Sequence, residues 1–304
     1  MPIVKRILKT ILPSGALRFL YRTRARAIRA RVRSLPVLTE HALSAILTDE
    51  LGLKNGDVVL VHSSIDHLNL NFHVSRILAL LQRITGPQDT LLFPTYPPLE
   101  SYEFLCRGEI FDVRKSPSYT GILSEIARRN PGARRSLHPT KSVCAIGPLA
   151  RELVSTHQCS AYPYDRCSPY YKMIEHGGKA IGIGVSTRKL SFAHCVEDAM
   201  QGQFPVQVYH DRLFPARCIN YSGEEEIVRT YAHDMNKMNH NTRRFVKRYV
   251  SEDICKDVTI HGMDFFRADS QRLFPAMMEL AKAGVTIYRR SPYSQLARRK
   301  TMSN

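Results

Sequence analysis

Between about residue 38 and residue 200, the apolar positions follow two alternating spacings. Short and mostly apolar runs at 58–61, 90–93, 142–146 and 180–185 predict buried strands. Apolar residues three or four apart predict helices between them, at 39–51, 74–84, 120–129, 168–177 and 192–200. Ser168 followed by Pro169 marks one helix start, with the hydroxyl as N-cap and Pro in the first turn. This alternation predicts a single α/β domain with helices on both faces of a central sheet.

The pattern changes after residue 205. Residues 206–209 and 217–221 predict the two strands of a hairpin, which would make the central sheet a mixed one. The remainder is expected to be mostly helical until the apolar stretch 285–288. In layered α/β folds the functional groups tend to lie where strands end. Polar residues that follow the predicted strands are therefore the candidates for chemistry.

The first 35 residues form a basic extension. Apolar residues recur at helical spacing from Ile3 to Leu12 with Lys5, Arg6 and Lys9 between them, which predicts an amphipathic helix that ends near Pro13. A second helical segment follows, with Arg residues near one row. The extension could lie on an anionic membrane, pack as a solvated or oligomer-forming arm, or bind nucleic acid. No nucleic-acid-binding motif supports the last interpretation, so nucleic acid is not expected as a partner.

Charge is concentrated at the two ends of the chain. The net charge is +17, with ten basic and no acidic residues in 1–35 and five basic and no acidic residues in 289–304. The body between them carries a net charge of only +2. Basic ends on a nearly neutral body indicate appended segments that meet an anionic surface. No apolar run reaches the roughly 18 residues that span a bilayer.

The seven cysteines show no pair at the spacing of a zinc or redox motif. They are expected to be free thiols in a reducing compartment, so we expect a cytoplasmic protein, with contact at the inner membrane face through residues 1–35. No bound metal is expected. The sequence does not indicate an oligomeric state.

His62, Ser63 and Ser64 directly follow the strand predicted at 58–61. Small polar groups at a strand end can bind an anion or an oxyanion through hydroxyls and backbone N–H groups. The alternative is a capped strand end with a core histidine.

A basic stretch precedes the strand predicted at 142–146. It holds Arg134, Arg135, Ser136, His138, Lys141 and Ser142. Two arginines, a lysine and several hydroxyls within nine residues could bind a phosphate-rich cofactor. The alternative is a solvated basic loop. The glycine spacing of a phosphate-binding loop is absent.

His194 lies in the helix predicted at 192–200, and Glu197 and Asp198 follow it at three and four residues. On a helix these carboxylates share a face with the histidine. A carboxylate beside a histidine orients the ring and raises its basicity, which suits a general base. A structural His–Glu pair is the alternative, and a metal site would need ligands that no local motif supplies.

Several ordered segments together resemble the aminoglycoside 3-N-acetyltransferase family over about residues 38–290. They are residues 56–64, 90–96, 111–113, 116–125, 134–142, 168–169 and 177–179, and His194 with Glu197. The order and spacing of the set are more specific than any one segment. The resemblance implies an acetyltransferase domain at 36–290, flanked by the extension 1–35 and a basic tail at 291–304.

The resemblance also implies acetyl-CoA as cosubstrate and an amine on an aminosugar as acceptor. His194 backed by Glu197 would be the base, and His62 and Ser63 would complete the catalytic site. Ser64 and the polar residues of 134–142 would bind the coenzyme. The acceptor could be an aminoglycoside, as in antibiotic resistance, or an aminosugar of a surface-polysaccharide or natural-product pathway. A function of another class, non-catalytic binding to membrane or nucleic acid through the basic ends, is the remaining alternative.

Overall fold

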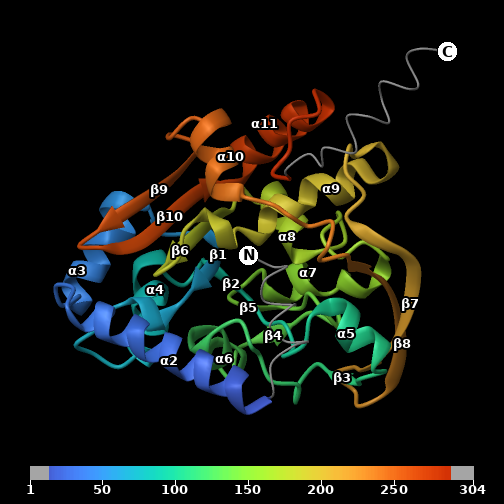
Figure 1. Ribbon diagram of the computed structural model, residues 1–304, viewed down its shortest axis with the longest axis horizontal. Coiled ribbons are helices and arrows are strands. Elements are labelled where there is room, and N and C mark those ends of the chain that lie inside the picture. The colour runs from blue at the N-terminus through green and yellow to red at the C-terminus, as the bar shows by residue number, and fades with distance from the viewer. Residues whose placement is uncertain (1–13, 289–304) are drawn as a thin grey trace.

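The computed structural model describes residues 14–288, and a seven-stranded sheet forms the centre of this part (Figure 1). Three parallel strands occupy its middle, in the order β2 (Thr90–Pro94), β1 (Val58–Ser63), β6 (Lys179–Ile183). Antiparallel strands extend both sides: β5 (Val143–Ile146) and β4 (Arg134–Arg135) beyond β2, and β10 (Met263–Asp269) and β9 (Cys255–Ile260) beyond β6.

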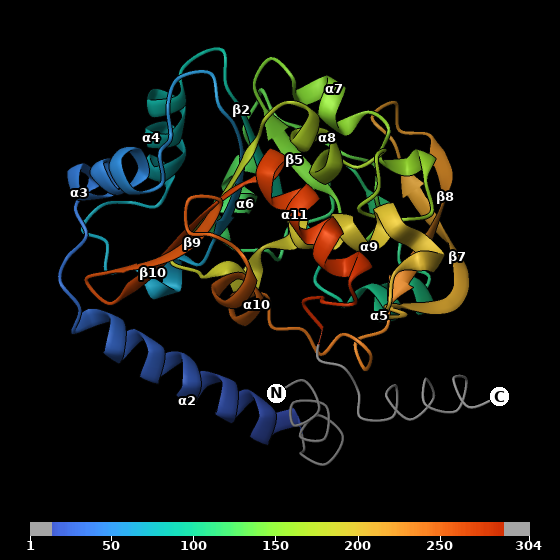
Figure 2. The same ribbon diagram turned by 90° about the horizontal axis from the view of Figure 1, so that it is seen from above.

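Helices cover both faces of this sheet (Figure 2). One face carries α3 (Glu40–Ala45), α4 (Ser75–Thr85) and α6 (Ile122–Arg128). The other carries α7 (Ala150–Val154), α8 (Pro169–Glu175), α9 (Cys195–Met200), α10 (Thr242–Tyr249) and α11 (Ser270–Lys282). Successive residues of β1 alternate between the two cores, because strand side chains point to opposite faces. The predicted layered α/β fold is confirmed.

The predicted helix starts are mostly confirmed by their caps. The Thr39 hydroxyl accepts from the backbone at the start of α3, which continues into the π-helix η1 (Ile46–Glu50), and Ser168 caps α8 with Pro169 in the first turn. Helix α6, predicted over 120–129, starts without a side-chain cap. Gly121, with φ of 114°, is the N-cap of α6, and the Thr120 hydroxyl donates to the Pro94 carbonyl instead.

The expectations for residues 206–288 need correction. The hairpin consists of β7 (Tyr209–Ile219) and β8 (Glu225–His233), so much of the second predicted arm belongs to the first strand. With β3 (Phe111–Asp112) it forms a separate three-stranded sheet over α5 (Ser101–Cys106). The central sheet is mixed because of β5 and β10, not because of this hairpin. Strands β9 and β10 lie where helix was expected, and 285–288 makes only one bridge, between Tyr288 and His240.

Helix α2 (Ser14–Arg33) lies beside the body and contacts η2 (Ile65–His67), the short helix that follows β1 (Figure 2). The helical character expected after residue 16 is confirmed. The amphipathic segment 3–12 and the tail 291–304 lie outside the described residues. Within residues 14–288, no helix is both long and apolar enough to span a bilayer.

Candidate active site

His194 and Glu197 form a close pair beyond the carboxyl end of β6. His194 ends the 3-10 helix η5 (Ser191–His194), and Glu197 lies in the first turn of α9. Nδ1 of His194 lies 2.8 Å from Oε1 of Glu197. This is the arrangement expected from the i, i+3 spacing, since residues three apart on a helix are neighbours.

Glu197 is held as an anion although it is only 3% exposed. Burial alone would raise the pKa of its carboxyl, but the neighbouring imidazoles of His194 and His233 outweigh burial and lower the pKa to about 2. The Tyr288 hydroxyl also donates to Oε1. Because an ionised carboxylate only accepts hydrogen bonds, Nδ1 of His194 must carry the shared proton. In the neutral ring, Nε2 then has the free lone pair that a general base requires.

Aromatic rings surround the His194 imidazole. The ring centroids of Tyr164, His233 and His240 lie 5.2, 5.3 and 5.6 Å from it. The His194 side chain keeps 12% of its surface exposed, and its Nε2 makes no hydrogen bond to another residue of the range 14–288. The rings therefore fix the imidazole and leave one nitrogen open to a substrate.

His233 faces the second oxygen of Glu197. Its Nε2 lies 3.6 Å from Oε2, and neither atom has another hydrogen-bond partner among the described residues. Burial lowers the pKa of His233 to about 3, so the ring is neutral at pH 7. His194, Glu197 and His233 each offer a ligand atom within 4.8 Å of the others, a spacing that could also hold a metal ion.

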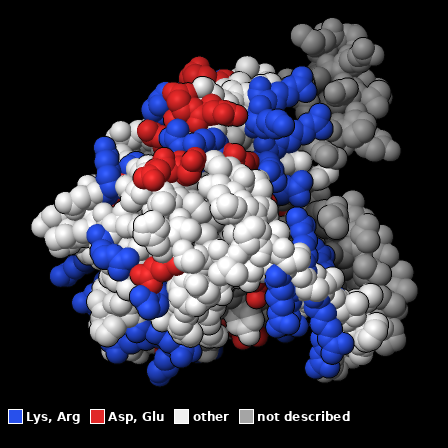
Figure 3. Space-filling model, turned by 90° about the vertical axis from the view of Figure 1, so that its left-hand side faces the viewer, with Lys and Arg blue, Asp and Glu red and all other residues white. Residues whose placement is uncertain are grey.

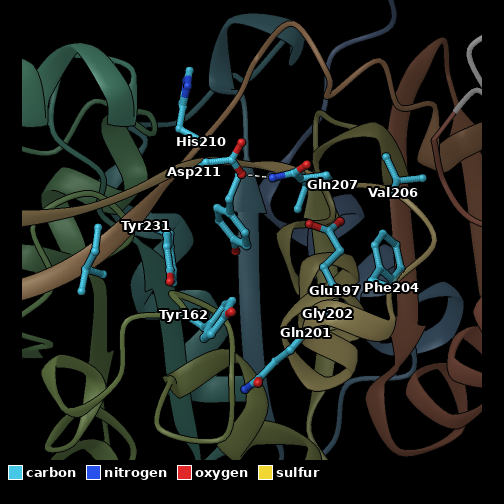
Figure 4. A pocket seen from close by; sticks show the side chains of 13 residues that line it. Tyr162, Glu197, Gln201, Gly202, Phe204, Val206, Gln207, His210, Asp211 and Tyr231 are labelled. Carbon is cyan, nitrogen blue, oxygen red and sulfur yellow. Dashed lines mark hydrogen bonds between the residues drawn. The ribbon is translucent and has the colours of Figure 1, made fainter.

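A cavity of about 450 Å³ opens beside the pair (Figure 4). Glu197 lies on one side of it, and Tyr162 and Tyr231 lie on the opposite side. The remaining lining comes from η6 (Gln201–Gln203), the segment 204–208 and strand β7. Its polar groups are hydroxyls, amides, the His210 imidazole and the carboxylates of Glu197 and Asp211. This set can hydrogen-bond a hydroxylated, amine-bearing ligand.

Asp198 does not share the role of Glu197. It is buried, and it accepts from the Tyr209 hydroxyl at 2.6 Å and from the Tyr164 backbone at 2.7 Å. Burial raises its pKa well above the usual value. Asp198 therefore positions two tyrosines near the pair and does not contact His194.

His62, Ser63 and Ser64 lie at the carboxyl end of β1, as predicted. Burial lowers the pKa of His62 to about 3, and its Nε2 lies 3.3 Å from the Ser191 hydroxyl. The Ser63 hydroxyl is buried without a partner among the described residues. The Ser64 amide donates to Ile183 at 2.9 Å, so it is not free for an oxyanion. The Ser63 hydroxyl thus remains as an unused donor at this strand end.

Most of the 134–142 stretch is bonded in the interior, so the alternative of a solvated loop is wrong. Arg135 is 2% exposed, and its guanidinium donates to backbone carbonyls of Thr95 and Ser116. Ser136, His138 and Ser142 are fully buried and bond His157, the loop backbone and Thr95. These residues stabilise the loop, and their assignment to the coenzyme stays a prediction.

The two remaining cations of the stretch, Arg134 and Lys141, differ in how far they are exposed. Arg134 is exposed and lies over the Tyr221 ring at 5.5 Å. The Lys141 ammonium lies 4.9 Å from the centre of the Tyr96 ring, and burial lowers its pKa to about 8. Tyr96 bonds Tyr164 at 3.1 Å, which connects Lys141 to the rings around His194.

Three partners of the pair were not predicted. Tyr288, His233 and His240 approach it from segments far along the chain. His233 lies on strand β8, His240 lies in the loop before α10, and Tyr288 lies in the segment after α11. No local motif marks them, because only the folded chain brings these segments to the edge of the sheet near the pair.

The comparisons with known proteins agree on one family and one fold. A family model described as aminoglycoside 3-N-acetyltransferase matches residues 60–282. An aminoglycoside N(3)-acetyltransferase III of Salmonella sp is 28% identical over 173 residues, 52% of this chain and 60% of that protein. A type IX enzyme of Micromonospora chalcea is 30% identical over 166 residues, 49% and 58% of the two chains. The matches thus span less than two thirds of these relatives.

Solved structures share the fold over most of the chain. The AAC-IIIb enzyme in a binary complex with CoASH has a TM-score of 0.68 at 20% identity and covers 84% of this chain and 100% of its own. AAC-VIa bound to sisomicin has a TM-score of 0.68 at 22% identity, with coverage of 82% and 99%.

Proposed function

Because the chain belongs to the aminoglycoside 3-N-acetyltransferase family, we propose that it transfers the acetyl group of acetyl-CoA to an amine of an aminoglycoside or related aminosugar. The observation that carries this proposal is the His194–Glu197 pair, buried on its carboxylate side and open at Nε2 beside a polar cavity. The CoASH and sisomicin complexes of the structural neighbours support the two substrate classes.

His194 is the general base of the proposed reaction. An ammonium at pH 7 has no lone pair, so a proton must leave before the nitrogen attacks the thioester carbonyl. That first proton leaves to solvent. Nε2 then takes the second proton, which the nitrogen loses as it attacks, and Glu197 stabilises the imidazolium that forms. A C–N bond forms as the C–S bond breaks, and the proton on Nε2 passes to the departing thiolate, so the products are the amide, CoASH and one proton in solution. The protein thus returns to its starting protonation state.

The Ser63 hydroxyl is the proposed oxyanion donor. Its oxygen is buried and lacks a partner among residues 14–288, and such a group has its full hydrogen-bonding capacity available. His62 is neutral and bonds Ser191, so we assign it to positioning and not to proton transfer. Arg134, which is exposed, and Lys141 and Ser64, which are half-buried, remain the members of the predicted coenzyme set that are not fully buried.

The acceptor is proposed to occupy the cavity beside Glu197. Neighbours bound to sisomicin and gentamicin support an aminoglycoside. An aminosugar of a polysaccharide or natural-product pathway fits the same hydroxyl, amide and carboxylate groups. The reaction needs no metal in this scheme, so a chelator should leave the rate unchanged.

Residues 1–35 are proposed to place the enzyme at an anionic membrane surface, which would be the inner face in a cytoplasmic protein. Within the described part, α2 carries six exposed or half-exposed arginines from Arg22 to Arg33 and exposes Phe19, Leu20 and Tyr21. Cations together with aromatic and aliphatic groups suit a lipid headgroup region.

The proposed activity is tested by incubating the protein with acetyl-CoA and a panel of aminoglycosides, nucleotide-linked aminosugars and lipid-linked aminosugars. Mass spectrometry should detect one acetylated acceptor together with CoASH. A protein that binds CoA and acetylates none of these amines would contradict the proposal.

A further inference from the structure

A second cavity, of about 350 Å³, is lined almost entirely by cations. Its lining residues are Arg188 of η4 (Thr187–Lys189), the capping residue Asn241, and Arg243, Arg244, Lys247 and Arg248 of α10. We call these six residues the α10 groove. Figure 3 shows Lys and Arg side chains gathered toward the right of the described part of the molecule, which is the side that faces the viewer in Figure 1.

Most of these charges are not neutralised by the protein. Arg243 lies 3.6 Å from Asp257 and 3.8 Å from Asp264. The other four cations are exposed, and none of them has an acidic partner within 4 Å among residues 14–288. Several unpaired cations around one hollow repel one another, and an anion with several negative oxygens relieves that repulsion.

The groove is also held in a fixed shape. Asp257 of β9 accepts from the Thr187 backbone and hydroxyl, both at 2.7 Å, and faces Arg243 at 3.6 Å. One carboxylate therefore joins η4 to α10. The Asn241 side chain caps α10 by accepting from the Arg244 amide. Preorganised walls lower the cost of ordering side chains around a ligand.

The α10 groove begins one residue from the ring cluster around the base. His240 contacts the His194 ring, with centroids 5.6 Å apart, and Asn241 follows it directly. Burial lowers the pKa of His62 and of His240, and the charge of Lys189, next to Arg188, lowers both pKa values further. The cationic surface thus extends close to the catalytic groups, and it would repel a polycationic aminoglycoside because both carry positive charge.

Two substrates must reach His194 in the proposed reaction, and the protein offers two hollows next to it. The cavity lined by Glu197 and tyrosines suits the hydroxylated, amine-bearing acceptor. The α10 groove suits phosphate groups, because guanidinium and ammonium groups bind phosphate oxygens through charge-assisted hydrogen bonds. Arg135 is buried and its guanidinium donates to the Thr95 carbonyl, so it is not available to the coenzyme phosphates. These phosphates therefore need other cationic partners.

We propose that the α10 groove binds the phosphate groups of the acyl donor, the pyrophosphate and 3′-phosphate of coenzyme A. This inference rests on the proposed function, since it takes the donor to be acetyl-CoA. A phosphorylated acceptor would offer the same chemistry, and the experiment separates the two sources.

The test is direct binding of CoA and of 3′-dephospho-CoA, measured by calorimetry without acceptor. The variant Arg244→Gln/Lys247→Gln/Arg248→Gln removes three charges and keeps most of each side-chain stem. The matched control Lys54→Gln/Arg151→Gln/Arg229→Gln removes three exposed charges elsewhere. Thermal unfolding of both variants checks that the fold is retained.

The wild-type protein should bind CoA more tightly than dephospho-CoA, and the groove variant should bind CoA at least 10-fold more weakly and lose that preference. The control variant should bind like the wild type. Equal CoA affinity in the groove variant would overturn the proposal. So would unchanged CoA affinity with a raised KM for a phosphorylated aminosugar, because the groove would then belong to the acceptor. Failure of the proposed function appears differently, as CoA binding without any acetyl transfer.

Discussion

Glu197 combines burial with a negative charge, and its partners explain how. A buried carboxylate without partners would take up a proton, because desolvation disfavours the charged form. Two imidazoles and a tyrosine hydroxyl face its two oxygens instead. The charge is thus kept where it can orient the His194 ring and stabilise its protonated form.

Replacing Glu197 with Gln should lower kcat about 10- to 100-fold, less than loss of the base itself. The amide can still accept at one oxygen, but it supplies no charge to the imidazolium. Steady-state kinetics at saturating acetyl-CoA and acceptor measure kcat. A variant that keeps the wild-type kcat would remove Glu197 from the mechanism.

Gly182 decides how closely two strands of the central sheet approach. A Cβ at this position would lie 2.1 Å from a ring atom of Phe266 and 2.7 Å from the Val185 carbonyl. Gly182→Ala should therefore lower the free energy of unfolding by about 1–3 kcal/mol, the usual cost of overpacking a core. Urea unfolding measures it. Gly132→Ala, where the nearest atom lies 3.5 Å away, is the control and should change little.

At the level of elements, the sequence predicts those with continuous apolar runs or clear helical spacing. Strands β1, β2, β5 and β6 lie close to the ranges expected, because each is buried and apolar along most of its length. Strands β7 to β10 are half exposed and alternate charged with apolar residues. Strand β7 is longer than the hairpin segments expected there, and β8, β9 and β10 lie where helix was expected, because their charged residues interrupt any continuous apolar run.

At the candidate site, too, contacts between residues close in the chain could be predicted and contacts that depend on tertiary packing could not. The spacing of His194 and Glu197 is local, so the sequence predicts their contact. The 134–142 stretch has the composition of a phosphate loop, yet Arg135 binds backbone carbonyls inside the protein. Composition cannot distinguish a cation that is bonded internally from one that faces a ligand. Lys141 and the residues of the α10 groove show that the distinction depends on tertiary packing.

Helix α2 is expected to act as a membrane contact that the chemistry does not need. At roughly 1 kcal/mol per basic residue near an anionic surface, even half of the charges of residues 1–35 give measurable partition. Full-length protein should sediment with phosphatidylglycerol vesicles at low salt and less so at high salt. Deletion of residues 1–33 should abolish sedimentation and leave turnover on a soluble acceptor intact.

Neutral phosphatidylcholine vesicles are the control for this prediction. Equal sedimentation with neutral and anionic vesicles, or none with either, would contradict a membrane role. Loss of turnover on deletion would show that α2 belongs to the catalytic unit.

Across the whole molecule, stability depends on keeping several histidines neutral. Burial lowers the pKa of His62, His157 and His233 to about 3, whereas the unfolded chain titrates near 6.5. Between these values the unfolded state binds more protons than the folded state. The contribution of these neutral histidines to the free energy of unfolding is therefore fully present above about pH 6.5 and is lost as the pH falls toward 3.

The urea midpoint should accordingly fall between pH 7 and pH 5, by an amount equivalent to roughly 2 kcal/mol for each of these histidines at pH 5. His157→Gln should reduce this pH dependence, because Gln retains a donor for the Pro163 carbonyl and cannot titrate. A midpoint that is constant over this range would contradict the account of the buried histidines.

The role of His194 as general base is tested by the steady-state rate of acetyl transfer in His194→Gln, with CoA affinity determined on the same protein. His73→Gln, a change at an exposed histidine far along the chain from the site, is the matched control. The account predicts that His194→Gln lowers kcat at least about 100-fold, binds CoA like the wild type, and differs from a fully active control. A His194→Gln protein that transfers acetyl groups at nearly the wild-type rate would contradict it.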